Sequence, residues 1–163
     1  MKLSSLALAA CLSLGSVSAF ALTRPLDVSS GSAGFFNTPP AGGFSDSYDF
    51  MVATPATLTG IITSVVNGGQ NIDFSSITLT GPSGLFSFAK ISNDPFEAWT
   101  ISTPLLSVGS YTLTLLGMNS PAIGTYSGDI ALSAAVPEPG SVALMLAGVG
   151  VVGFVVVRRR SRA

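Results

Sequence analysis

The sequence predicts an all-β fold, a small antiparallel β-sandwich of about six to eight strands, with a signal peptide before it and a transmembrane helix after it. Three observations support this prediction. Apolar and polar residues alternate from Phe44 to Val52, which is typical of a half-buried strand. Turn-forming residues separate the short apolar segments that follow, and no window shows the period of an amphipathic helix. A chain of 163 residues can hold one such domain.

The sandwich is predicted to occupy residues 44–135. Its expected strands are 44–52, 56–66, 72–80, 85–91, 96–102, 108–115 and 124–132. Glycine-rich or proline-containing turns separate them, as at 67–71 and 81–84. Residues 22–43 are rich in Ser, Gly and Pro, so we expect a flexible segment with at most one edge strand around Ala33 to Phe36.

Residues 1–21 have the features of a signal peptide that the export machinery would read. Lys2 supplies the positive start, and Leu6 to Val17 is an apolar stretch too short for a membrane span. Two small-residue sites for cleavage follow, one ending at Ala21 and one ending at Ala19. The mature protein is therefore expected to begin at Leu22 or at Phe20.

Residues 136–163 have three parts. The motif Pro137, Glu138 and Pro139 comes first, and an uncharged apolar run over 141–157 follows. As a helix this run would be roughly 25 Å long, near the lower limit for a membrane span. The basic tail is Arg158, Arg159, Arg160 and Arg162. Because basic residues favour the cytoplasmic side, the domain is expected to lie outside the cytoplasm.

This three-part tail resembles the PEP-CTERM sorting signal. The resemblance implies that an exosortase in the membrane of a Gram-negative bacterium cuts the chain near Pro137, Glu138 and Pro139. The protein would then be held in the inner membrane only until it is released to the cell surface or the exopolysaccharide matrix. The alternative is a permanently anchored membrane protein with a periplasmic domain.

A second resemblance lies in the first predicted strand. Phe44, Asp46, Tyr48 and Phe50 resemble the motif of the FxDxF group of PEP-CTERM proteins, with Tyr48 at the place of the second phenylalanine. Asp46 has the inward phase, where a carboxylate needs hydrogen bonds or a cation. Backbone N–H groups at a sheet corner are the simpler partner. Asp46 is the best single candidate for calcium, but Asp49, Asp73, Asp94 and Asp129 form no ligand loop, so no metal is predicted.

The composition excludes most enzyme classes. The chain has no histidine, and its single cysteine, Cys11, lies in the predicted signal peptide. The domain therefore lacks the usual zinc and haem ligands and the residues of a Ser-His-Asp or Cys-His centre. Residues 22–135 hold two basic and seven acidic residues, which disfavours nucleic-acid binding. We expect a non-enzymatic protein without a cofactor.

Two surface features remain as functional candidates. Trp99 is the residue most suited to bind a sugar ring of the exopolysaccharide, with Tyr48, Tyr111 and Tyr126 as further members of an aromatic platform. Aromatic residues of a small sandwich are more often core. The three T-x-T sequences at 57–59, 78–80 and 112–114 would each place two threonines on one strand face. Their irregular spacing predicts no lattice for ice, and a solvated strand face is the simpler interpretation.

Overall fold

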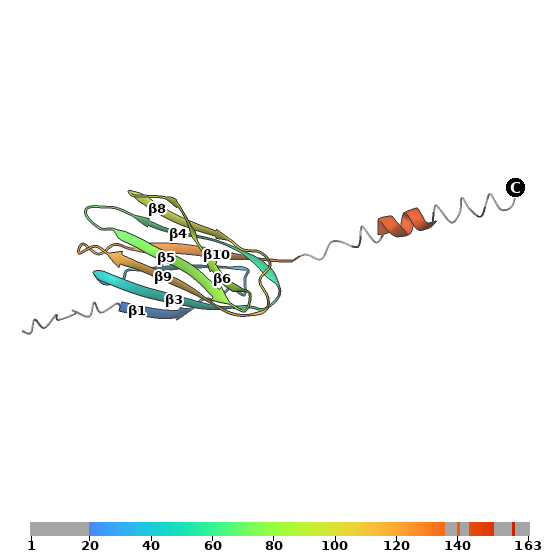
Figure 1. Cartoon of the computed structure of the whole chain (residues 1–163), viewed down its shortest axis with the longest axis horizontal. Helices are drawn as coiled ribbons and strands as arrows, with labels where there is room; N and C mark the ends of the chain where they lie inside the picture. Colours follow the sequence, from blue (N-terminus) through green and yellow to red (C-terminus); the bar gives the residue numbers. More distant parts are fainter. Residues whose placement is uncertain (1–19, 136–139, 141–143, 152–157, 159–163) are drawn as a thin grey trace, which may run out of the picture.

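The computed structural model describes residues 20–135, 140, 144–151 and 158. Within residues 20–135, ten strands form two facing five-stranded sheets (Figure 1). The strands are β1 (Phe20–Pro25), β2 (Ser32–Asn37), β3 (Gly42–Val52), β4 (Ala56–Val65), β5 (Ile72–Gly81), β6 (Gly84–Ser87), β7 (Ala89–Ser92), β8 (Phe96–Ser102), β9 (Gly109–Asn119) and β10 (Tyr126–Ala134). The predicted all-β class is confirmed.

Sheet A has the strand order β1-β3-β9-β5-β6, and sheet B has the order β2-β10-β4-β8-β7. Among these strands every neighbouring pair is antiparallel except β1 with β3, which run parallel. The long strands β3 and β9 pair over their whole lengths at the centre of sheet A. The predicted antiparallel pairing is therefore confirmed, with one parallel exception at an edge.

The core fills the space between the sheets with the inward side chains of each strand. Aromatic rings contribute much of it, because Phe44, Tyr48, Phe50, Tyr111 and Tyr126 are all at most 5 % exposed. Two glycines make room for such rings. A Cβ at Gly128 would lie 2.3 Å from the ring of Phe35, and one at Gly117 would lie 2.8 Å from the ring of Phe44. These close approaches leave no space for a side chain at either position.

The segment before Phe44 differs from the prediction. It contributes two strands, where at most one was expected. β1 is the edge of sheet A and β2 is the edge of sheet B, paired with β10. Within the described residues, the sandwich therefore already includes the segment from Phe20 onward. The sequence did not reveal this because edge strands bury few side chains, so β1 has almost no apolar alternation to detect.

The predicted single strand 85–91 is also two strands. β6 pairs with β5 in sheet A, and β7 pairs with β8 in sheet B. Phe88 lies between them, is 5 % exposed, and donates its N–H to the carbonyl of Ile77. The chain thus crosses from one sheet to the other at a buried aromatic residue. A continuous apolar run hides such a crossing, because both halves look like strand.

Candidate functional site

The four residues of the FxDxF-like motif lie on β3 and all point into the core. Phe44 and Phe50 stack against Tyr126 and Tyr111, respectively. Their spacing of two is that of alternate residues on one face of a strand, so the motif supplies core residues to sheet A. Membership of the FxDxF group stays a prediction.

Asp46 is a buried carboxylate, 1 % exposed. Its Oδ2 accepts hydrogen bonds from Asn37 Nδ2 at 2.8 Å and from the Tyr126 hydroxyl at 2.5 Å. Both donors belong to sheet B, on β2 and β10, whereas Asp46 belongs to sheet A. The partners are therefore side chains of the opposite sheet and not the backbone N–H groups of a sheet corner. The sequence could not show this, because the pairing depends on how β2 and β10 face β3.

The tyrosines extend this network. The Tyr48 and Tyr126 hydroxyl oxygens are 2.9 Å apart. The Tyr126 hydroxyl has one proton, which it donates in the hydrogen bond to Asp46. Tyr48 is therefore the donor in its hydrogen bond to the Tyr126 oxygen. Burial, followed by the hydrogen bond to Asp46, raises the pKa of Tyr126 far above the usual tyrosine value, and burial raises the pKa of Tyr48. Both hydroxyls therefore stay protonated and hold Asp46 as part of a clasp between the sheets.

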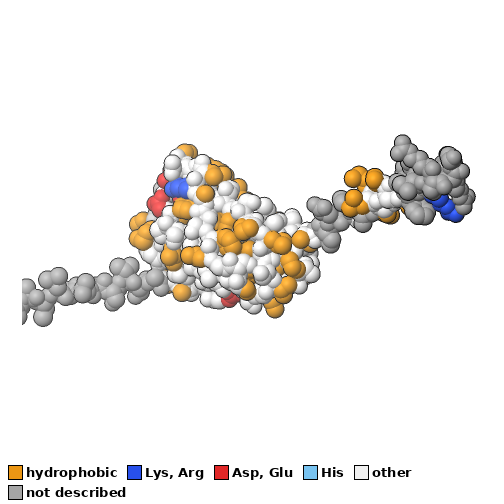
Figure 2. Space-filling view, turned by 45° about the vertical axis from the view of Figure 1, so that its right-hand side comes forward, with side chains coloured by type: hydrophobic (Ala, Val, Ile, Leu, Met, Phe, Trp, Pro, Cys, Tyr) orange, Lys and Arg blue, Asp and Glu red, His pale blue; other side chains and the backbone are white. Residues whose placement is uncertain are grey.

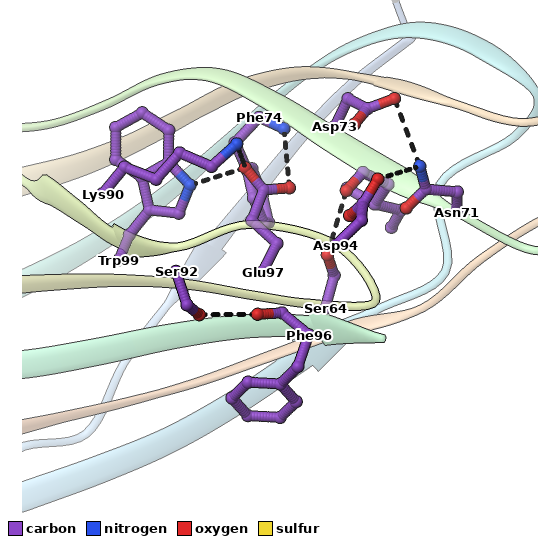
Figure 3. Close-up of polar contacts among 11 residues, drawn as sticks. Ser64, Asn71, Asp73, Phe74, Lys90, Ser92, Asp94, Phe96, Glu97 and Trp99 are labelled. Carbon is purple, nitrogen blue, oxygen red and sulfur yellow. Dashed lines mark hydrogen bonds and ion pairs between the residues drawn. The ribbon is translucent and has the colours of Figure 1, made fainter. Parts of the chain in front are cut away.

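A second polar cluster lies where β5 meets the β7–β8 hairpin (Figure 3). Among the described residues, Asp73, Asp94 and Glu97 are the acidic group whose oxygens lie within 4.8 Å of one another. Asp73 and Asp94 are exposed, whereas Glu97 is fully buried. The Asn71 side-chain amide bridges the two exposed residues, donating to Asp73 at 3.3 Å and to Asp94 at 3.2 Å. Asp46 is not part of this group.

Glu97 has three partners within the described residues. Lys90 Nζ lies 2.7 Å from Oε1, Trp99 Nε1 donates to Oε1 at 2.8 Å, and the Phe74 N–H donates to Oε2 at 3.4 Å. The hydrogen bond to Glu97 raises the pKa of Lys90. Since Lys90 neutralises Glu97, two exposed carboxylates and one amide oxygen remain for a cation. The cluster therefore fastens the β7–β8 hairpin to β5, and the expectation that the domain binds no metal stays a prediction.

Sequence reasoning considered Asp73 and Asp94 among the possible oxygen ligands of a cation but did not consider Glu97. The usable signal was the alternation Glu97, Trp99 and Ile101, which the structure turns inward as one face of β8. Ile101 is the apolar member of that face and is 8 % exposed. The sequence left the choice of face open, because the opposite phase also contains apolar residues.

The proposed aromatic platform does not form. Tyr48, Tyr111 and Tyr126 are each 1 % exposed, so none of them can stack on a sugar. Trp99 is half-buried against the core, and Lys90 Nζ lies 5.9 Å from its ring centre. The grouping of four rings is wrong because the tyrosines belong to the inward faces of β3, β9 and β10. Sugar binding by Trp99 alone stays a prediction.

The C-terminal segment follows the last strand closely. β10 ends at Ala134, and the Ala135 N–H donates to the carbonyl of Pro55 at 3.0 Å. Residues 144–151 are helical and exposed. In the part of the chain that the structure describes, no helix has both the length and the apolar character needed to cross a membrane. Pro137, Glu138 and Pro139, the rest of the expected 141–157 span, Arg159, Arg160, Arg162 and the predicted signal-peptide residues 1–19 lie outside the described residues.

Comparison of the sequence with protein families decides what this segment is. Residues 135–160 match the model of the PEP-CTERM protein-sorting motif. The chain carries a PEP-CTERM sorting signal. This signal indicates an exported protein that is sorted by an exosortase, as the resemblance of the tail implied. No curated protein matches the sequence. The PEP-CTERM signal begins one residue after β10, so it adjoins the sandwich directly.

Solved structures similar to the sandwich have low identity. The pre-peptidase C-terminal domain of a collagenase from Bacillus anthracis has 16 % identity and a TM-score of 0.42, covering 69 % of this chain and 95 % of that one. PliG of Aeromonas hydrophila, a periplasmic inhibitor of g-type lysozyme, has 14 % identity and a TM-score of 0.44, covering 71 % and 100 %. The function of this PEP-CTERM chain is therefore argued from its own residues.

Proposed function

We propose that this chain is an exported, non-enzymatic protein of the cell surface or exopolysaccharide matrix, delivered when an exosortase cuts near Pro137, Glu138 and Pro139. The match of residues 135–160 to the PEP-CTERM motif carries the proposal. The apolar run 141–157 is the temporary membrane anchor, and the basic tail of Arg158, Arg159, Arg160 and Arg162 faces the cytoplasm.

The position of the motif supports release of an intact domain. All ten described strands end by Ala134, so a cut within 137–139 leaves every strand of the sandwich in the released part. Two observations support the proposed non-enzymatic role. The chain has no histidine and no cysteine other than Cys11, and Glu97, the single glutamate of the domain, is ion-paired with Lys90. This composition fits a protein that acts through the surface of a stable fold and not through catalysis.

The two candidate signal-peptide sites are not equivalent in the structure. Phe20 and Ala21 pair with Phe44 and Ser45 as the first residues of β1. Cleavage after Ala21 would remove these two pairs from a six-residue strand, whereas cleavage after Ala19 keeps the strand whole. Pairing supports Phe20 as the mature N-terminus.

The deciding experiment follows the protein in host cells with and without the exosortase. In normal cells, mass spectrometry of the surface and culture fractions should find a chain that starts at Phe20 and ends near Pro137, Glu138 and Pro139. Deleting the exosortase should retain the chain in the membrane with its end at Ala163. A triple variant, Pro137→Ala with Glu138→Ala and Pro139→Ala, should behave like the deletion.

The control for this experiment is the wild-type chain in the same cells with the exosortase restored. A chain that still ends at Ala163 in normal cells would show a permanent anchor and contradict the sorting proposal. A shortened chain in the deletion strain would contradict processing by the exosortase.

A further inference from the structure

The outer face of sheet A carries a continuous row of hydroxyl groups, one from each of its five strands. The pairing registers place Thr23 beside Ser47, Ser47 beside Thr114, Thr114 beside Thr78, and Thr78 beside Ser87. These five residues are the hydroxyl row, which runs across the strands from β1 to β6. With strands about 4.8 Å apart, the row is roughly 19 Å long.

The row faces solvent. The flanking residues Tyr48, Leu113 and Leu115 point into the core, so the residues between them point outward. None of the five residues is buried. Within the described part of the chain, no hydrogen bond joins any of the five hydroxyls to a protein group. Each is therefore open to an external donor or acceptor.

The neighbouring positions give the face an amphipathic border. Thr112 and Thr80 pair directly beside the row. The Thr80 side chain adds a further hydroxyl, whereas the Thr112 hydroxyl donates to Asp49 Oδ1 at 2.6 Å. Exposed aliphatic side chains lie on the same face, at Met51, Leu85 and Leu116. No charged residue belongs to the row itself, and Asp49 adjoins it on the same face of β3. Figure 2 shows the surface of the sandwich from one side. This combination of hydroxyls and short apolar surfaces matches the chemistry of a neutral sugar polymer.

The registers bring two of the three T-x-T sequences side by side. Thr78 and Thr80 of β5 stand directly beside Thr114 and Thr112 of β9, whereas Thr57 and Thr59 lie on β4 in sheet B. The sequence could not show this, because β5 and β9 are far apart along the chain. Spacing in sequence says nothing about which strands become neighbours.

We propose that the hydroxyl row is the docking line of a single neutral polysaccharide chain that lies across the strands of sheet A. The proposal rests on the proposed function, which takes the protein to an exopolysaccharide. The domain has a formal net charge of about −5, so an anionic polymer would be repelled while a neutral one is not.

The shape of the sheet favours a polymer chain over an ice surface. Neighbouring strands in a sheet are rotated by about 20–25° relative to one another, so the five hydroxyls turn progressively along the row. A flexible glycan can follow a twisted line and exchange hydrogen bonds at each strand. A flat crystal plane can meet only part of it.

The test measures binding of the purified full chain to sensors that carry dextran, galactomannan or hydroxyethyl cellulose, with alginate as the anionic comparison. A polyoxyethylene detergent keeps the tail in solution without adding sugar groups. The wild-type chain should bind at least one neutral polymer more tightly than alginate. The variant T78V/T114V should bind that polymer about tenfold more weakly, the loss expected for two neutral hydrogen bonds.

Two matched variants separate the hydroxyls from the fold. T57V/T59V makes the same change on the outer face of sheet B and should bind like the wild type. T78S/T114S keeps both hydroxyls in the row and should also bind like the wild type, which a merely damaged strand would not do. Thermal unfolding of each variant shows whether the domain is intact.

Several outcomes would overturn the proposal. The first is that the wild-type chain binds none of the three neutral polymers, and the second is that it binds alginate more tightly. The third is that T57V/T59V or T78S/T114S loses as much affinity for the neutral polymer as T78V/T114V does. Adsorption to growing ice crystals without binding to a neutral polymer would show that the hydroxyl row binds ice and not a polysaccharide. Because purified protein is used, these results do not depend on sorting, whose failure would appear instead in the mass of the C-terminus.

Discussion

The sandwich holds two buried carboxylates, and the regions around them are built differently. Asp46 lies between the sheets and is held by an amide and a tyrosine hydroxyl, both neutral. Glu97 lies at the end of the sandwich and is held by a lysine as well as by neutral N–H groups. Each carboxylate joins one sheet to the other, Asp46 through β2 and β10 and Glu97 through the Phe74 N–H of β5.

The difference shows how access to water determines the partner. Lys90 keeps 36 % of its side chain exposed, so its ammonium group can pair with Glu97 and stay partly hydrated. A lysine beside Asp46 would have to be fully desolvated, which costs several kcal/mol per ion. Neutral donors avoid that cost. Asn37 of β2 and Tyr126 of β10 thus take at Asp46 the place that Lys90 takes at Glu97.

The largest expected effect comes from removing the tyrosine partner of Asp46. Tyr126→Phe should lower the free energy of unfolding by about 3 kcal/mol, because it leaves a buried charged group with one donor and Tyr48 without an acceptor. Tyr48→Phe is the matched control, since it also removes one hydroxyl but keeps the bond to Asp46. It should cost about 1 kcal/mol. Urea unfolding measures both, and equal losses would contradict the chain of hydrogen bonds from Tyr48 through Tyr126 to Asp46.

The second effect concerns the ion pair. Lys90→Met should lower the free energy of unfolding by about 2 kcal/mol, below the value for a fully buried pair because solvent screens the exposed lysine. Arg24→Met removes the other basic side chain of the sandwich and should change stability by less than about 0.5 kcal/mol. If the two variants were equally stable, the partner of Glu97 would be its N–H donors alone.

The sequence predicted the parts of this comparison that depend on alternation within one strand. The inward phase of Asp46 and the strand that carries it are confirmed, because β3 alternates without interruption. The partners Asn37 and Tyr126 were beyond reach, since they come from strands 9 and 80 positions away. The same limit hid the burial of Glu97, the crossing at Phe88 and the hydroxyl row. Each of these depends on register between strands, which a local pattern does not contain.

The smallest effect is the dependence of stability on alkaline pH, which is absent at neutral pH. It distinguishes the region of Asp46, where Tyr126 titrates, from the region of Glu97, where Lys90 titrates. Tyr126 and Lys90 both have a raised pKa in the folded state, so the stability that each contributes is present below its ordinary value and lost as pH rises above it. The ordinary values are 10.0 for tyrosine and 10.5 for lysine. Stability of the wild type should therefore fall above pH 10.

Tyr126→Phe should reduce this fall more than Lys90→Met does, because burial keeps the Tyr126 proton in place while water reaches Lys90. Urea unfolding at a series of alkaline pH values would measure how fast the free energy of unfolding falls with pH in each variant. If Lys90→Met reduced this fall more than Tyr126→Phe does, the ion pair would be the less hydrated of the two regions.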